Sequence, residues 1–198
     1  MDIIFLDFAK AFHKVPHMCL LAKLQAHGID GCVLEWIASW LQGRMQRVCL
    51  DGHSSRWAFM LSGVPQKSVL GPLLFLIFVN DLDSNVRNVL LKFADDTKVF
   101  GKVNSNVDRL QQQENLNRLH NWANRWQMEF NVTKCVTTHV GNGNIEFQYS
   151  MQGRQLDRVK TAKDLEICIS SNLKSAEHCY ESYSKANRML GLSTEFQI

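Results

Sequence analysis

The chain has 198 residues, 45% of them hydrophobic, which is enough for one sizeable core or for one domain with an appendage. Its formal net charge of +3 gives only a weak preference for polyanions, because strongly basic nucleic-acid-binding domains carry a denser excess of Lys and Arg. The longest apolar run, residues 69–79, is too short to cross a bilayer and contains a Gly-Pro pair near its start, so we expect no membrane span.

The first forty residues are predicted to contain one buried strand and two helices. Residues 3–8 form a short apolar run with a carboxylate near its end, which is typical of a central strand that delivers Asp7 to a sheet edge or cleft. Apolar residues then recur at helical spacing on both sides of Gly28. We therefore expect two helices joined near this glycine, the second of them amphipathic and well buried.

The next segment is predicted to form a hairpin and a buried helix. Asp51-Gly52 is a hairpin signal between residues 47–50 and 57–61. Residues 63–68 are predicted to form a loop that leads into a helix with Pro72 in its early turn. Because that helix is apolar nearly all round, it should pack inside the molecule.

The second half of the chain mixes strands and helices. Residues 90–100 predict a second hairpin with Asp95 and Asp96 at or near its turn, and residues 107–126 predict a helix. A strand pair around Gly153, a strand near residues 165–169 and a last helix should follow. The order shows no regular β-α repeat, so the predicted fold class is α+β.

Two adjacent carboxylates, Asp95 and Asp96, interrupt a stretch that otherwise suits a buried strand. Together with Asp7 at the end of the first strand, they could hold two Mg²⁺ ions for an in-line phosphoryl displacement. In that case the carboxylates of Asp7 and Asp95 should converge to roughly 4 to 6 Å, the span of a shared metal. The alternative is a plain polar turn beside a strand-terminating Asp, since Asp favours turns.

Four segments together carry a family resemblance. They read LDFAKAF at 6–12, SGVPQKSVLGPLLF at 62–75, FADDT at 93–97 and WQMEFNVTKC at 126–135. In this order and spacing, the chain resembles the reverse transcriptases of non-LTR (LINE-type) retrotransposons, especially the CR1 and jockey groups, from about residue 2 to residue 192.

The resemblance implies a fold, an activity and partners. The fold would be a reverse-transcriptase palm, an antiparallel sheet packed on helices, over residues 1–150, with the palm end and the start of a thumb-like helical region over 151–198. The activity would be RNA-directed DNA synthesis with two Mg²⁺ ions, or Mn²⁺ in their place. The partners would be an RNA template, a DNA primer and deoxynucleoside triphosphates. The alternative function is a catalytically inactive retrotransposon remnant that binds at most RNA or protein.

The resemblance also assigns a role to individual residues of the metal site. Asp7 matches the first metal-binding aspartate, and Asp95 matches the first aspartate of the pair that completes the site. Asp96 matches the second member, a less direct ligand that adds negative charge. Lys134 resembles a basic residue that protonates or neutralises the pyrophosphate leaving group, but a solvated surface lysine explains it equally well.

Two further positions match residues near the incoming nucleotide. Phe12 matches the bulky residue that excludes a 2′-hydroxyl, although an ordinary core Phe is the alternative. Gln66 matches the segment that approaches the nucleotide and the template. The tryptophans at 122 and 126 favour helix packing over base stacking, and the scattered histidines make a zinc site improbable.

Three positions depart from the family pattern. His13 replaces the Asp of DFSKAFDKV, Lys67 replaces the Gly of PQGS, and Glu166 replaces the Gly of KDLG. Since glycine permits backbone angles that other residues avoid, the change at position 67 is the most serious of the three. We therefore expect a palm-centred fragment that retains its metal ligands but binds primer-template poorly, with the fingers region lying before Met1.

The six cysteines are widely scattered, with no paired spacing and no secretory leader before them. They are expected to be reduced and mostly buried thiols of an intracellular protein. No targeting signal is visible, so both cytoplasm and nucleus are open as locations.

Overall fold

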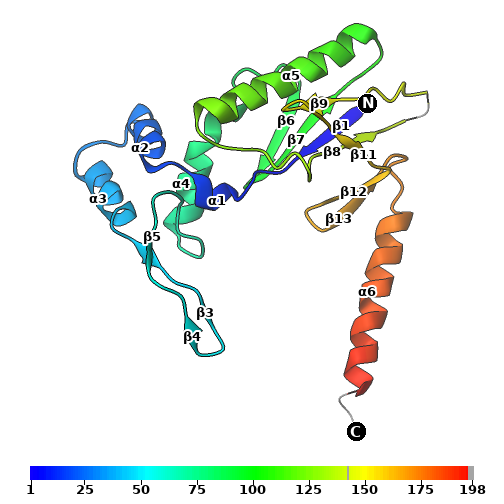
Figure 1. The fold of residues 1–198 in the computed structure, drawn as a ribbon. Helices are drawn as coiled ribbons and strands as arrows, with labels where there is room; N and C mark the ends of the chain where they lie inside the picture. Colours follow the sequence, from blue (N-terminus) through cyan, green and yellow to red (C-terminus); the bar gives the residue numbers. More distant parts are fainter. Residues whose placement is uncertain (142, 196–198) are drawn as a thin grey trace.

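The computed structural model describes residues 1–141 and 143–195. At the centre of the fold is a mixed five-stranded sheet with the strand order β11-β8-β1-β7-β6 (Figure 1). The predicted first strand is confirmed as β1, which pairs antiparallel with β7 on one side and with β8 on the other, while β11 runs parallel to β8. The five strands are β1 (Asp2–Leu6), β6 (Val89–Phe93), β7 (Asp96–Gly101), β8 (Val136–His139) and β11 (Asp157–Arg158).

One face of the sheet packs against helices. Ile4, Leu6 and Val99 from the strands share a buried cluster with Phe75 of α4 and Leu116 of α5. The helices are α1 (Ala11–Lys14), α2 (His17–Ala26), α3 (Gly31–Leu41), α4 (Leu70–Phe78), the 3₁₀ helix η1 (Asn80–Asp83), α5 (Asn106–Arg125) and α6 (Ala176–Glu195). The opposite face of β1 and β7 is thus left for the site described below.

Local sequence signals explain where α5 begins. The Ser105 hydroxyl accepts a hydrogen bond from the Asp108 backbone N–H, and the Asp108 carboxylate accepts one from the Ser105 backbone N–H. This reciprocal capping box satisfies two backbone donors that a helix start leaves without partners. The helix predicted over residues 107–126 is therefore confirmed, with its boundaries one residue earlier at each end.

A long β-ribbon projects from the helical side of the molecule. Its turn, Asp51-Gly52, has φ values of 46° and 78°, the positive angles that a two-residue hairpin of this hand requires. The predicted hairpin is thus confirmed. The paired segments of the ribbon are β2 (Met45–Gln46) with β5 (Ala58–Phe59), and β3 (Cys49–Leu50) with β4 (His53–Ser54).

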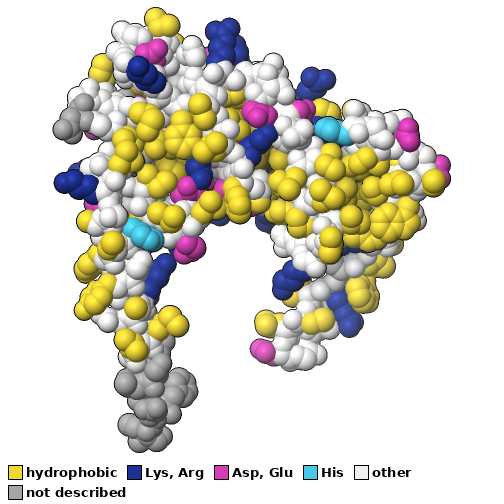
Figure 2. All heavy atoms as spheres, turned by 180° about the vertical axis from the view of Figure 1, so that it is seen from behind, with side chains coloured by type: hydrophobic (Ala, Val, Ile, Leu, Met, Phe, Trp, Pro, Cys, Tyr) yellow, Lys and Arg dark blue, Asp and Glu magenta, His cyan; other side chains and the backbone are white. Residues whose placement is uncertain are grey.

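The C-terminal part forms two small hairpins and a long helix. β9 (Ser150–Met151) pairs with β10 (Arg154–Gln155), and β12 (Thr161–Asp164) pairs with β13 (Ile167–Ser170). Helix α6 then extends away from the sheet. Figure 2 shows that α6 and the β-ribbon form two projections with an open hollow between them.

Some burial predictions were wrong. Helix α4 is not apolar core all round, because Leu73 and Leu76 are each 50% exposed, and on α3 only Ile37 and Leu41 are buried. The cysteines are free thiols as expected, but the expectation that most are buried fails, since those at 32, 49 and 179 are exposed. Within the described part of the chain, no helix has the length and apolar character that a bilayer crossing would need.

Candidate active site

Asp7 and Asp96 lie at the same end of two neighbouring strands. The antiparallel register of β1 and β7 pairs Leu6 with Thr97, so Asp7 and Asp96 follow at the next position on each strand. Because side chains alternate across a sheet, this register directs both carboxylates to one face, opposite the helical core. Both residues line a cavity of about 380 Å³.

The cavity lies between the central sheet and the β12–β13 hairpin. Phe5 and Val136 contribute an apolar floor from the sheet, while Ala162 and Asp164 line it from β12. Lys134 completes the polar rim, and its Nζ lies 3.4 Å from Asp7 Oδ2. The cavity lining thus combines carboxylates, the three lysines Lys98, Lys134 and Lys163, and a partly apolar wall.

Asp95 occupies the turn between β6 and β7. Phe93 pairs with Asp96, which leaves Ala94 and Asp95 as the two central residues of the hairpin. Ala94 has φ of 53°, a left-handed angle that costs a residue with a Cβ about 1–2 kcal/mol. Asp95 is half-buried and is not among the residues that line the cavity. The second predicted hairpin is confirmed, and it holds a strained turn at the carboxylate pair.

The pKa of Asp96 is raised by its surroundings. Partial burial and the negative charges of Asp95, Asp164 and Asp7 raise the pKa of Asp96, and the nearby Lys98 ammonium opposes that rise. The raised pKa of Asp96 therefore reflects its partial burial and the negative side chains near it.

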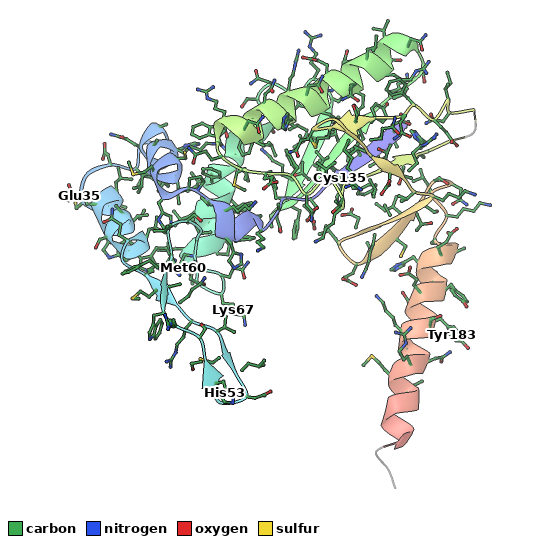
Figure 3. The ribbon with its side chains drawn as sticks, in the orientation of Figure 1. Glu35, His53, Met60, Lys67, Cys135 and Tyr183 are labelled. Atoms are coloured by element: carbon green, nitrogen blue, oxygen red, sulfur yellow. The ribbon has the colours of Figure 1, made fainter. Side chains whose placement is uncertain are left out.

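The segment after α5 brings Lys134 to the site. Asn131 N donates to the Asp7 carbonyl at 2.8 Å, and Phe8 stacks on Phe130 with ring centroids 4.4 Å apart. Cys135 follows Lys134 and is buried under the site, where burial, the largest cause, raises the pKa of its thiol to about 11 (Figure 3). These contacts fix the backbone at Lys134, while its side chain is 67% exposed.

Phe12 and the loop at residues 63–68 lie outside the cavity. Phe12 is half-buried and stacks on Phe75 at 4.4 Å, so it has the packing of a core residue. Gly63 lies so close to the Phe12–His13 backbone that a Cβ would come within 2.8 Å of the His13 carbonyl. Gln66 is exposed on this loop, beside Lys67 (Figure 3).

Lys67 has a φ of 58°. This left-handed angle is the one that the glycine of the family pattern would take without strain. Glu166, the other replacement of a family glycine, also has a positive φ, 66°, in the turn between β12 and β13. Lys67 and Glu166 therefore both adopt a backbone angle that favours glycine, although each has a side chain.

Of the predicted site residues, the structure brings Asp7, Asp96 and Lys134 into one cavity. Lys98 and Asp164 were missed by the sequence analysis although both line it. Lys98 carried a usable signal, because it lies two residues after Asp96 and so shares its face of β7. No sequence signal pointed to Asp164, since its position depends on how the β12–β13 hairpin packs over the central sheet. Across residues 1–141 and 143–195, no three His, Cys, Asp or Glu side chains are already arranged as a metal centre.

The chain thus has an α+β fold with helices on one face of its sheet and carboxylates at adjoining strand ends on the other. The solved structure of apo telomerase from Candida tropicalis, truncated from its C-terminal domain, has a similar fold, with a TM-score of 0.58 and 14% identity over 88% of this chain and 34% of that chain. Residues 2–192 match the reverse transcriptase (RNA-dependent DNA polymerase) family, and the chain belongs to this family.

The similar curated proteins come from mobile elements. The RNA-directed DNA polymerase from mobile element jockey of Drosophila melanogaster is 31% identical over 184 residues, which cover 88% of this chain and 20% of that protein. The probable RNA-directed DNA polymerase from transposon BS of the same species is 28% identical over 214 residues, covering 96% and 23% respectively. The predicted relationship to jockey-type retrotransposon enzymes is thus confirmed. The chain spans about a fifth of the length of these relatives.

Proposed function

We propose that this chain is the polymerase core of a jockey-like retrotransposon enzyme, with RNA-directed DNA synthesis as its reaction. In this proposal residues 1–150 are the palm, and residues 151–198 are the palm end and the start of the thumb. The partners are an RNA template, a DNA primer and deoxynucleoside triphosphates. The observation that supports the proposal most strongly is that Asp7 and Asp96 share one cavity, with Asp95 in the adjoining turn.

The donor set suits Mg²⁺. Hard divalent cations prefer oxygen ligands and need only one or two carboxylates when substrate phosphates and water complete the shell. Asp7, Asp95 and Asp96 are the residues that would hold two Mg²⁺ ions, or Mn²⁺. When bound, such ions stabilise the charge that develops on the attacking and leaving oxygens of the displacement.

The remaining roles belong to the chain's own side chains. The exposed ammonium of Lys134 is free to move from Asp7 toward a pyrophosphate leaving group and to donate a proton or neutralise charge there. Phe12 would restrict space at the sugar of the incoming nucleotide, and its stacking on Phe75 would keep the ring in place. Gln66 would contact the nucleotide or the template from its exposed loop.

A primer-extension assay tests this proposal. The purified chain, an RNA template, a DNA primer and Mg²⁺ should give extension that disappears in Asp7→Asn and Asp95→Asn. Asp30→Asn is a matched control, because Asp30 is exposed at the start of α3 and makes no side-chain capping bond there. Extension that survives either of the first two substitutions would contradict the assigned metal site.

A second candidate function has structural support of its own. Lys67 and Glu166 both impose backbone strain where the family has glycine. This favours a catalytically inactive remnant that binds at most RNA or protein. RNA binding that is unchanged in Asp7→Ala, together with no metal-dependent incorporation by the unaltered chain, would establish this function instead.

A further inference from the structure

The β12–β13 hairpin covers one side of the candidate site without joining the central sheet. At its base, a backbone hydrogen bond from Val159 N to the Thr137 carbonyl at 2.9 Å attaches the hairpin to β8, and one from Ser171 N to the Lys160 carbonyl at 2.7 Å closes the hairpin on itself. Its tip, at residues 164–167, lies at the opposite end of the hairpin. Because these backbone bonds lie at the base, the position of the tip depends on side-chain contacts.

The buried contact at the tip is an ion pair between Lys98 Nζ and Asp164 Oδ2. The two side chains are only 10% and 14% exposed, and they come from β7 and from the end of β12. Lys98 is two residues beyond Asp96 on the same strand face, and all three residues line the cavity. The pair thus joins the hairpin tip to the strand that carries a predicted metal ligand.

The hairpin tip also makes a more exposed contact with α6, through Glu166, which pairs with Lys163 of the cavity lining as well. Glu166 Oε2 lies 2.7 Å from Lys163 Nζ and 3.4 Å from Lys185 Nζ of α6, and all three side chains are about half exposed or more. Solvent screens such pairs, so they contribute little to the position of the hairpin. A buried pair differs, because removing one partner leaves a desolvated charge unpaired.

We propose that Lys98 and Asp164 are a positioning pair, which holds the β12–β13 hairpin against the sheet so that the cavity keeps the shape needed for the reaction. This role rests on the proposed polymerase function. Neither side chain is assigned contact with the reacting atoms. They act through the hairpin, which forms the wall facing Asp7 and Asp96.

Hydrogen exchange tests the positioning role directly. Lys98→Met and Asp164→Asn should each accelerate exchange of the amides in residues 161–170 by about tenfold to a hundredfold, while β1 and α5 keep their protection. The control Lys185→Met, which breaks only the exposed pair, should leave hairpin exchange unchanged. A hairpin that is equally protected in both variants, or loosened in only one of them, would overturn the proposal.

The double variant Lys98→Met/Asp164→Asn gives a second measurement if a single variant folds poorly. Because the double variant leaves no unpaired charge, its loss of protection should be clearly smaller than the sum of the two single losses. Strictly additive losses would show that the two residues do not act through each other, and would also overturn the proposal.

Mn²⁺ titration and primer extension separate positioning from simple charge effects. Lys98→Met removes a positive charge beside the carboxylates and should tighten Mn²⁺ binding, whereas Asp164→Asn removes a negative charge and should weaken it. Both variants should nevertheless lower nucleotide incorporation. If incorporation instead rose in Lys98→Met and fell in Asp164→Asn, as Mn²⁺ affinity does, the positioning role would be contradicted. If the unaltered chain incorporates no nucleotide, the proposed function fails, while hairpin exchange still decides the role of the pair.

Discussion

Lys134 Nζ lies 3.4 Å from Asp7 Oδ2 at the mouth of the cavity, and the lysine side chain is 67% exposed. An exposed ion pair of this kind contributes little to stability, because water and salt screen it. A backbone hydrogen bond from Asn131 N to the Asp7 carbonyl nevertheless keeps the segment that carries Lys134 next to the predicted metal ligands. The residue pair is thus better suited to chemistry than to holding the fold together.

Lys134→Met should therefore lower nucleotide incorporation by about 10²-fold, the usual contribution of a positioned general acid, without changing the free energy of unfolding. Single-turnover primer extension and urea denaturation measure the two quantities. Lys160→Met is the control, because Lys160 is also exposed but does not line the cavity. Equal rates for the Lys134 and Lys160 variants would remove Lys134 from the mechanism.

Lys67→Gly should stabilise the chain. Lys67 has a φ of 58°, which costs a residue with a Cβ about 1–2 kcal/mol, and its exposed side chain loses little on removal. Part of the gain is offset because glycine raises the entropy of the unfolded chain, so we expect a net increase of about 0.5–1 kcal/mol in the free energy of unfolding.

The comparison is Gln66→Gly, one residue earlier on the same exposed loop. Gln66 is not among the residues with positive φ, so this substitution should be neutral or destabilising. Urea unfolding of both variants gives the answer. If Lys67→Gly also raises primer extension, strain in this loop limits activity, and if both glycine variants are destabilised, strain at Lys67 is not significant.

The sequence predicted those parts of the site that depend on local patterns. The apolar run before Asp7 predicted a strand end, and the residues around Asp95 and Asp96 predicted a hairpin, but not that the two lie side by side. The register between β1 and β7 places Asp96, and not Asp95, in the cavity with Asp7. This register depends on how distant strands pair, so it could not be predicted from local sequence patterns. The roles of these carboxylates as metal ligands remain predictions.

Other features escaped the sequence analysis because they depend on contacts between distant segments. Asp164 reaches Lys98 across 66 positions of sequence, so no local spacing could indicate it. Burial of α3 was overestimated because an apolar helical stripe identifies a face that favours burial, not the partner that covers it. Trp36 on this helix is 56% exposed and stacks on Trp40, with ring centroids 6.4 Å apart.

Thiol labelling should divide the cysteines by position. Cys32, Cys49 and Cys179 are exposed and should react with an aromatic disulfide at pH 8 within minutes. Cys135 should react only after unfolding, because burial both blocks access and raises the pKa of its thiol to about 11. Mass spectrometry of the labelled chain identifies the sites, and fast labelling of Cys135 in the folded chain would show that the backbone beneath Lys134 opens readily.

A buried carboxylate at the start of β1 should govern acid stability. Asp2 is fully buried and its two oxygens bond to His139 Nδ1 at 2.8 Å, Tyr149 Oη at 2.6 Å and Asn144 Nδ2 at 2.6 Å. Burial alone would raise the pKa of Asp2, but the three side-chain hydrogen bonds outweigh it and hold that pKa below its usual range. The ionised form is therefore the one that the folded chain prefers.

The direction of the pH effect follows from this lowered pKa. The unfolded chain binds the proton more readily, so the contribution of Asp2 is complete above its unfolded pKa of about 3.9 and is lost as the pH falls through the lower folded value. Asp2→Asn should cost about 2–4 kcal/mol at pH 7, since it leaves buried donors with a poorer acceptor. It should also flatten the loss of stability below about pH 4.

Urea unfolding from pH 3 to pH 7 measures both effects. Asp157→Asn is the control, because Asp157 is exposed on the edge strand β11 of the same sheet. An Asp2→Asn variant that keeps the acid dependence of the unaltered chain would show that other carboxylates set it. The bonds to Tyr149 and Asn144 also tie β1 to the segment after β8, so loss of this carboxylate should weaken the frame that carries Asp7 as well as the acid response.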